Sequence, residues 1–198
     1  MGSTGIPFNS SAIPDFTISG VLPPFRGQSP TVMALMSPYR ANLIQIADKM
    51  CKSDERKAIF RGLLSYRQQL ASLGFTRGIQ WLSGSFMEDI ETLEQRPPND
   101  IDIVTLCHRP KGLVENDVAW RMFCDSNRKL LSPTETKKTY QCDSYFVDLD
   151  SGVLNVVDQS RYWFGLFSHR RGGVWKGLLQ VSLTVTQDDV EASLMVRS

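Results

Sequence analysis

Residues 100–106 are the part of the sequence that most constrains the fold. They read Asp-Ile-Asp-Ile-Val-Thr-Leu, so two carboxylates alternate with branched apolar residues. This pattern is typical of a β-strand, in which side chains two positions apart lie on the same face. Asp100 and Asp102 are therefore expected to point together, while Ile101 and Ile103 point into the core. A Pro-Pro-Asn segment directly before them places both aspartates at the start of the strand.

Two carboxylates this close repel each other unless a cation lies between them. Oxygen ligands of this kind select Mg²⁺ or Mn²⁺, which also accept phosphate oxygens. Gly84 and Ser85 form a predicted turn after a short strand, and such a turn offers backbone N–H groups and a hydroxyl to phosphates. Asp-x-Asp alone also occurs by chance in solvated strands. Here the apolar residues around Asp100 and Asp102 favour a metal site that assists nucleotidyl transfer.

The remaining segments alternate between helical and strand patterns without a regular β-α-β repeat, which predicts an α+β fold with a small mixed sheet flanked by helices. One helix is expected to begin at Ser37-Pro38, and a second runs from Ser53 to a stop at Gly74. The other expected helices cover residues 115–131 and the segment after Thr186. The other expected strands cover residues 78–82, 140–149 and 175–186.

Composition narrows the class of protein. The 198 residues carry a formal net charge of +1, which excludes a histone-like polycation and limits nucleic-acid contact to a local patch. No apolar stretch approaches the roughly 18 residues of a membrane span, and the first residues lack the pattern of a secretory signal. Four widely spaced cysteines favour reduced, buried thiols over a zinc site. A cytoplasmic protein that does not contact membranes is expected.

Two motifs resemble the nucleotidyltransferase superfamily of the DNA polymerase beta type. Trp-Leu-Ser-Gly-Ser-Phe at residues 81–86 and Pro-Asn-Asp-Ile-Asp-Ile-Val at residues 98–104 match its Gly-Ser turn and Asp-x-Asp pattern, with fourteen residues between Ser85 and Asp100. Gly-Val-Leu-Pro-Pro-Phe at residues 20–25 and Lys176-Gly177 are similar to segments of a group of small, largely uncharacterised bacterial proteins of this fold. Residues 1–36 are rich in Pro, Gly and Ser but carry apolar residues, which predicts an extended arm that lies along the domain or a partner. The resemblance implies a nucleotidyltransferase-like domain over residues 37–198.

The resemblance also implies a two-metal site in which Asp100 and Asp102 bind both ions. A third carboxylate on a neighbouring strand would help to activate the attacking hydroxyl. Asp143 and Asp148 are the candidates, and their odd spacing sends them to opposite faces of one strand. Asp143 is preferred because small residues flank it, whereas Asp148 lies near a turn and is expected to be solvated.

A basic stretch over residues 159–176 carries Arg170 and Lys176 among several aromatic residues and no acid. Bases interleaved with aromatics can hold a triphosphate, so these two residues are candidate nucleotide ligands. For the aromatic side chains a place in the core is the favoured interpretation. The stretch contrasts with an acidic one over residues 88–102, which has a single base, Arg96.

The expected activity is Mg²⁺- or Mn²⁺-dependent transfer of a nucleoside monophosphate from a nucleoside triphosphate such as ATP to an acceptor hydroxyl. A protein partner is the favoured acceptor and an RNA end is next, in a toxin–antitoxin or phage (antiviral) defence setting. Second-messenger synthesis and tRNA modification are less favoured. The alternative is an inactive module of this fold that acts as an antitoxin or assembly subunit. The apolar arm favours partner contact either way, and the sequence indicates no oligomeric state.

Overall fold

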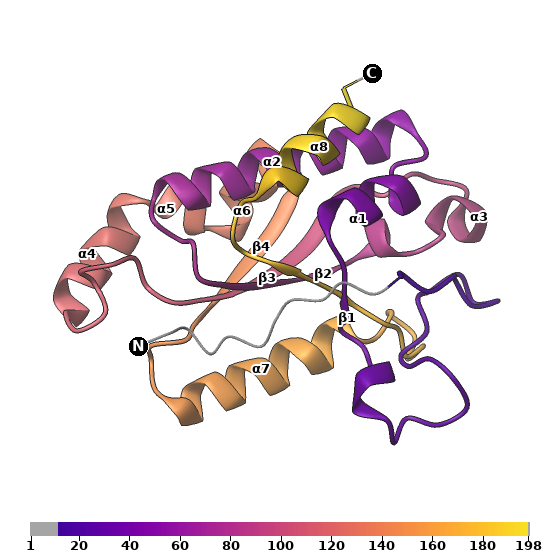
Figure 1. The fold of residues 1–198 in the computed structure, drawn as a ribbon, viewed down its shortest axis with the longest axis horizontal. Coiled ribbons are helices and arrows are strands. Elements are labelled where there is room, and N and C mark those ends of the chain that lie inside the picture. Colours follow the sequence, from indigo (N-terminus) through magenta and orange to yellow (C-terminus); the bar gives the residue numbers. More distant parts are fainter. Residues whose placement is uncertain (1–11, 198) are drawn as a thin grey trace.

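The computed structural model describes residues 12–197, which fold around one five-stranded mixed sheet (Figure 1). The strands are β1 (Tyr39–Arg40), β2 (Gly78–Ser83), β3 (Ile101–Cys107), β4 (Cys142–Asp148) and β5 (Leu179–Ser182). Within the same residues there are eight α-helices, α1 (Leu43–Met50), α2 (Asp54–Ser72), α3 (Ile90–Glu94), α4 (Asp117–Ser126), α5 (Arg128–Leu131), α6 (Pro133–Tyr140), α7 (Val153–Phe167) and α8 (Gln187–Met195). Two 3-10 turns, η1 (Met33–Leu35) and η2 (Ser85–Met87), complete the set. The predicted α+β class is confirmed.

The strand order in the sheet is β1-β5-β2-β3-β4. β3 pairs antiparallel with β2 and parallel with β4, and β1 pairs parallel with β5. In this register Ser83 of β2 lies opposite Asp102 of β3, and Asp102 lies opposite Asp143 of β4. The end of β2 and the beginnings of β3 and β4 therefore meet at one edge of the sheet.

The two faces of the sheet are covered differently. α2, α6 and α8 lie on one side and α7 alone crosses the other (Figure 1). The larger core lies on the first side and includes Ile101 and Ile103, which point inward as the alternation predicts. The smaller core joins Val104 and Leu106 of β3 to Phe167 of α7. Because Asp102 alternates with the inward isoleucines, it shares the α7 face of β3 with Val104.

The described part of the predicted N-terminal arm packs on the domain. Leu22 is fully buried in the larger core, and Val21 forms a bridge with Glu88. Ile18, an apolar residue of the arm, is fully exposed. Residues 1–11 of the arm lie outside the described residues.

The prediction that a helix begins at Ser37-Pro38 is wrong. Tyr39 pairs in parallel with Leu179 as part of β1, and the Ser37 hydroxyl accepts a hydrogen bond from the Leu178 N–H. The helix begins only after Asn42, whose side chain accepts from the Gln45 N–H while the Gln45 side chain accepts from the Asn42 N–H. This reciprocal cap gives hydrogen-bond partners to the N–H groups of Asn42 and Gln45, whereas the Ser37-Pro38 pair provides no such cap.

The helix predicted over residues 115–131 is broken into α4 and α5 at Asn127. The Asn127 side chain donates to the Phe123 carbonyl, so this polar residue closes α4. Val118 and Met122, two apolar residues of this segment, are 67% and 66% exposed. The strand expected over residues 175–186 is also shorter, since β5 contains only its central part.

Other predictions agree with the structure. Ser53 caps α2, which ends at Ser72 just before Gly74, and Thr186 caps α8. All four cysteines are free, and three of them are buried. None of the helices within residues 12–197 has the length and apolar character needed to cross a bilayer.

Candidate metal centre

Asp100, Asp102 and Asp143 come together at the edge where β3 and β4 begin. Each offers a carboxylate oxygen, and the three oxygens lie within 4.8 Å of one another. Within residues 12–197 this is the one group of three or more Asp, Glu, His or Cys side chains arranged in this way. The cluster is partly buried, and its oxygen-only donor set suits a hard divalent cation. Three such oxygens can hold a divalent metal ion.

The sheet register brings the three carboxylates together. Asp100 directly precedes β3 and Asp102 is its second residue, so the two share a face. Asp143 is the second residue of β4 and pairs with Asp102 in the parallel register. Register partners in neighbouring strands point to the same face, which places Asp143 beside Asp102. The prediction that Asp143 supplies the third carboxylate agrees with this geometry.

The cluster carries an electrostatic penalty. Burial of Asp102, together with the negative charges of Asp100 and Asp143, raises the pKa of Asp102 to about 6. The ammonium groups of Lys176 and Lys137 act in the opposite direction on this pKa. Burial and like charges both disfavour the ionised form, and a bound cation would reverse this balance.

Gly84 lies against the carboxylate of Asp102. Its φ of +82° belongs to the left-handed region that favours glycine, and it precedes η2 as the N-terminal cap residue. A Cβ atom at this position would lie 2.9 Å from Asp102 Oδ2 and 3.2 Å from the Asp102 backbone nitrogen. Glycine is therefore needed for the turn to pass this close to the carboxylate. The predicted Gly84-Ser85 turn lies directly beside the aspartates.

Lys137 of α6 also reaches the cluster, although no pattern in the sequence indicates this contact. Its ammonium nitrogen lies 2.5 Å from Asp100 Oδ2 and 3.8 Å from Asp143 Oδ2. The hydrogen bond to Asp100 raises the pKa of Lys137. Thr136, the preceding residue, is buried and shares a hydrogen bond of 2.8 Å with Ser144 of β4. This contact fixes α6 against β4 and directs Lys137 to the edge of the sheet.

Asp148, the rejected candidate for the third carboxylate, lies at the other end of β4. It pairs in register with Cys107, the last residue of β3. It is not simply solvated, as the sequence led us to expect, because its Oδ2 accepts a 2.8 Å hydrogen bond from Arg109 Nε. A pocket of about 260 Å³ beside it is lined mainly by apolar side chains, including Trp120 and Phe146.

Arg170 and Lys176, the predicted nucleotide ligands, are already paired with acids. Lys176 Nζ lies 2.6 Å from Glu88 Oε1, and these side chains are only 6% and 5% exposed. Arg170 Nε lies 3.0 Å from Glu88 Oε2, and a second guanidinium nitrogen lies 2.6 Å from Glu94. Glu88 and Glu94 of the acidic stretch thus neutralise two cations of the basic stretch. Lys176 remains close enough to Asp102 to lower its pKa.

The aromatic residues of the basic stretch belong mainly to the smaller core. Trp163, Phe164 and Phe167 of α7 pack against β-strand side chains, as the favoured interpretation of the sequence has it. Ser83, next to the Gly84 turn, donates to the Phe167 carbonyl at 3.1 Å. The end of α7 is thereby joined to the strand that borders the centre.

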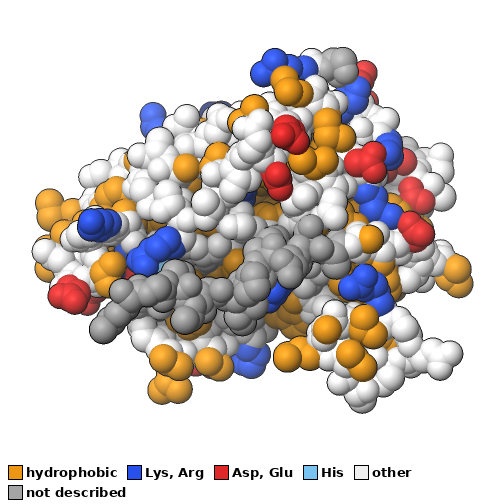
Figure 2. Space-filling view, viewed as in Figure 1, with side chains coloured by type: hydrophobic (Ala, Val, Ile, Leu, Met, Phe, Trp, Pro, Cys, Tyr) orange, Lys and Arg blue, Asp and Glu red, His pale blue; other side chains and the backbone are white. Residues whose placement is uncertain are grey.

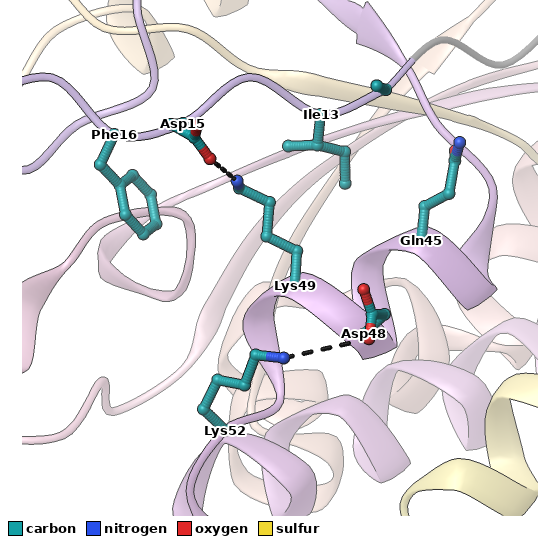
Figure 3. Close-up of a pocket in the computed structure, with 8 residues that line it drawn as sticks. Ile13, Asp15, Phe16, Gln45, Asp48, Lys49 and Lys52 are labelled. Carbon is teal, nitrogen blue, oxygen red and sulfur yellow. Dashed lines mark hydrogen bonds and ion pairs between the residues drawn. The ribbon is translucent and has the colours of Figure 1, made fainter.

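A larger pocket of about 650 Å³ lies away from the aspartates, between residues 12–16 and α1. Figure 3 shows Lys49 reaching across it to Asp15, with which it forms a 2.6 Å ion pair, and Lys52 pointing toward Asp48. Its charged side chains pair with each other, Lys49 with Asp15 and Lys52 with Asp48. None of its lining residues belongs to the candidate metal centre, so the size of this pocket gives no information about the chemistry of that centre.

Fold and site together define an α+β protein that carries an acidic triad at the edge of a mixed sheet. Residues 14–182 match the model of a family of unknown function, DUF6932, and the chain belongs to that family. No curated protein and no solved structure matches the chain.

Proposed function

We propose that the protein is a metal-dependent nucleotidyltransferase. The observation that carries this proposal is the convergence of Asp100, Asp102 and Asp143, from two parallel strands, beside the Gly84-Ser85 turn. The same arrangement is what the resemblance to the DNA polymerase beta type superfamily implies for its turn and its three carboxylates. Mg²⁺ or Mn²⁺ is the proposed cofactor, because the donor set consists of carboxylate oxygens alone.

In the proposed reaction an acceptor hydroxyl oxygen attacks the α-phosphorus of a nucleoside triphosphate. A new O–P bond forms, the bond between the α-phosphorus and the bridging oxygen breaks, and pyrophosphate leaves. Divalent ions held by the aspartates would lower the pKa of the hydroxyl and neutralise the leaving group. Asp143 would help to accept the hydroxyl proton. The backbone N–H groups and the Ser85 hydroxyl of the Gly84-Ser85 turn would hold the outer phosphates.

A protein hydroxyl is the proposed acceptor, with an RNA end second. The face in Figure 2 shows basic and acidic side chains interspersed rather than a continuous basic stripe. The chain as a whole is close to neutral. Long-range attraction of a polyanion depends on clustered positive charge, so this distribution favours a protein acceptor. A toxin–antitoxin or phage-defence setting remains the proposed context.

The decisive experiment offers the full chain each of four α-³²P-labelled triphosphates, ATP, GTP, CTP and UTP, with Mg²⁺ or Mn²⁺. Total protein and total RNA from the source cells serve as acceptors. We expect label in a specific acceptor, and we expect it to fall at least about a thousandfold in Asp100→Asn and Asp102→Asn, which remove metal ligands.

Asp148→Asn is the matched control for this experiment. It removes a carboxylate from the same strand as Asp143, but at the opposite end, where Arg109 holds it. It should label the acceptor at nearly the rate of the parent protein, provided that its melting temperature shows a folded chain. Equal labelling by the Asp102 variant and the parent would rule out the proposed enzyme.

The second candidate function is an inactive module of the same fold that binds a partner. The observation that favours it is the pairing of Lys176 and Arg170 with Glu88, since these cations are not free for a triphosphate. This candidate predicts that ATP does not bind at concentrations up to about 1 mM in the presence of Mn²⁺, whereas the enzyme requires binding within that range. Equilibrium dialysis with labelled ATP and Mn²⁺ separates the two.

A further inference from the structure

The ammonium group of Lys137 lies among the carboxylates of the candidate metal centre. It contacts Asp100 Oδ2 at 2.5 Å and approaches Asp143 Oδ2 at 3.8 Å. Its position is that of a counterion, because it brings one positive charge to a cluster of three carboxylates. Nothing in the sequence assigns Lys137 to the site, and the proposed reaction does not use it.

This counterion is held differently from the other cations nearby. The Lys137 side chain is 54% exposed, whereas Lys176 is 6% exposed and fixed by Glu88. A lysine side chain is a compact charge on a flexible four-carbon stem, so Lys137 can turn into water without leaving a cavity in the core. Thr136 would stay in place, anchored to Ser144, while the ammonium moves.

A divalent ion needs the same oxygens. Asp100 Oδ2 cannot sit at hydrogen-bonding distance from the ammonium and also bind a metal without bringing two cations close together. Two like charges a few ångströms apart repel each other strongly in a partly buried site. Binding of a metal ion and retention of Lys137 in its observed position therefore oppose each other.

We propose that Lys137 is a displaceable counterion that competes with the divalent ion for Asp100 and Asp143. This inference rests on the proposed function, since it takes the aspartates as metal ligands. Its consequence is that the centre binds the metal more tightly together with a nucleoside triphosphate than as a free ion. The triphosphate supplies anionic oxygens both to the metal and to the released ammonium, so it offsets the charge that Lys137 loses.

The test measures Mn²⁺ binding to the full chain without nucleotide, by electron paramagnetic resonance of the free ion. Lys137→Met keeps the length of the side chain and removes its charge. We expect it to bind Mn²⁺ about tenfold or more tightly than the parent protein, because a competing charge within 4 Å is gone. Lys137→Arg keeps the charge and should bind Mn²⁺ no more tightly than the parent.

Lys138→Met is the matched control. Lys138 is the next residue of the same exposed helical turn, and among residues 12–197 it forms no ion pair with the three aspartates within 4 Å. Its removal should change Mn²⁺ affinity by no more than about twofold, since exposed charges at a distance are screened by salt. A gain equal to that of Lys137→Met would mean that only the net charge matters, and would overturn the inference.

A second measurement uses the non-hydrolysable analogue α,β-methylene-ATP. It should raise the Mn²⁺ affinity of the parent by a larger factor than that of Lys137→Met, which no longer needs the anion. If the parent binds Mn²⁺ and Lys137→Met binds it no more tightly, the inference fails while the metal site stands. If neither protein binds Mn²⁺ with or without the analogue, the proposed function fails and the inference fails with it.

Discussion

Asp102 lies directly opposite Asp143 across the parallel pairing of β3 and β4. Parallel neighbours send paired side chains to the same face, so the register itself places two negative charges side by side. Asp100 adds a third from the residue just before β3, and the three oxygens lie within 4.8 Å. An arrangement that costs stability in the absence of a cation is typical of a functional centre rather than of architecture.

The first prediction concerns this cost. Asp102→Asn removes a carboxylate whose pKa is raised to about 6 by burial and by its acidic neighbours. We expect the metal-free variant to be more stable than the parent at about pH 8, by roughly 1–3 kcal/mol in the free energy of unfolding. Urea denaturation in the presence of EDTA measures this difference. A variant less stable than the parent would show that the Asp102 carboxylate stabilises the fold.

The second prediction is a pH dependence that follows from the same group. The pKa of Asp102 in the folded protein, about 6, is higher than the ordinary value of 3.8, so the folded state binds the proton more tightly than the unfolded state. Its contribution therefore favours folding below about pH 4 and is lost as the pH rises through about 6. The stability difference between Asp102→Asn and the parent should grow over this window.

The pH effect is best measured as the difference in unfolding free energy between Asp102→Asn and the parent, because other carboxyls titrate in the same pH range. Contacts with Arg56 hold the pKa of Glu91 below its ordinary value, and its contribution has the opposite sign. Adding saturating Mn²⁺ should remove most of the slope due to Asp102, since the ion favours the ionised form. A difference that stays constant between about pH 4 and 7 would contradict the assignment.

The third prediction tests the turn at Gly84. Gly84→Ala places a Cβ atom against Asp102 in a backbone conformation that favours glycine. Gly112→Ala is the matched control, because Gly112 also has a positive φ but has open space around it. Both should lose about 1–2 kcal/mol through backbone strain. Only Gly84→Ala should also weaken Mn²⁺ binding, as measured by calorimetry, because its Cβ displaces a ligand. Equal Mn²⁺ affinity in the two variants would contradict the role of the turn.

The acidic cluster of the candidate site could be predicted because its parts are local patterns. The alternation in residues 100–106 fixes the faces of Asp100 and Asp102 through strand geometry alone, and small neighbours favoured Asp143. The start of α1 was predictable as well, although the Ser37-Pro38 signal led to the wrong residue. Asn42 and Gln45 carry the spacing of a reciprocal cap, and that signal locates the observed start.

Lys137 and the Glu88 pairs could not be predicted in the same way. Glu88 and Lys176 are 88 positions apart, and their contact depends on how β2, β5 and the loops between them come together. Lys137 lies in a polar helix whose orientation is set by Thr136 against Ser144. A charge run in a sequence shows neither its partner nor its burial, so the basic stretch suggested a phosphate site where the structure has ion pairs.

The last prediction concerns the buried pair of Glu88 and Lys176. Glu88 binds Lys176 through Oε1 and Arg170 through Oε2, so Glu88→Gln leaves two cations with a weaker partner, whereas Lys176→Met leaves Glu88 with Arg170. We expect Glu88→Gln to be the more destabilising change, by about 3–5 kcal/mol, because one buried charge loses its counterion. The double variant should cost less than the sum, with a coupling of about 1–3 kcal/mol in urea denaturation. Additive costs would mean that the two groups do not stabilise each other, and that Lys176 remains available to a triphosphate.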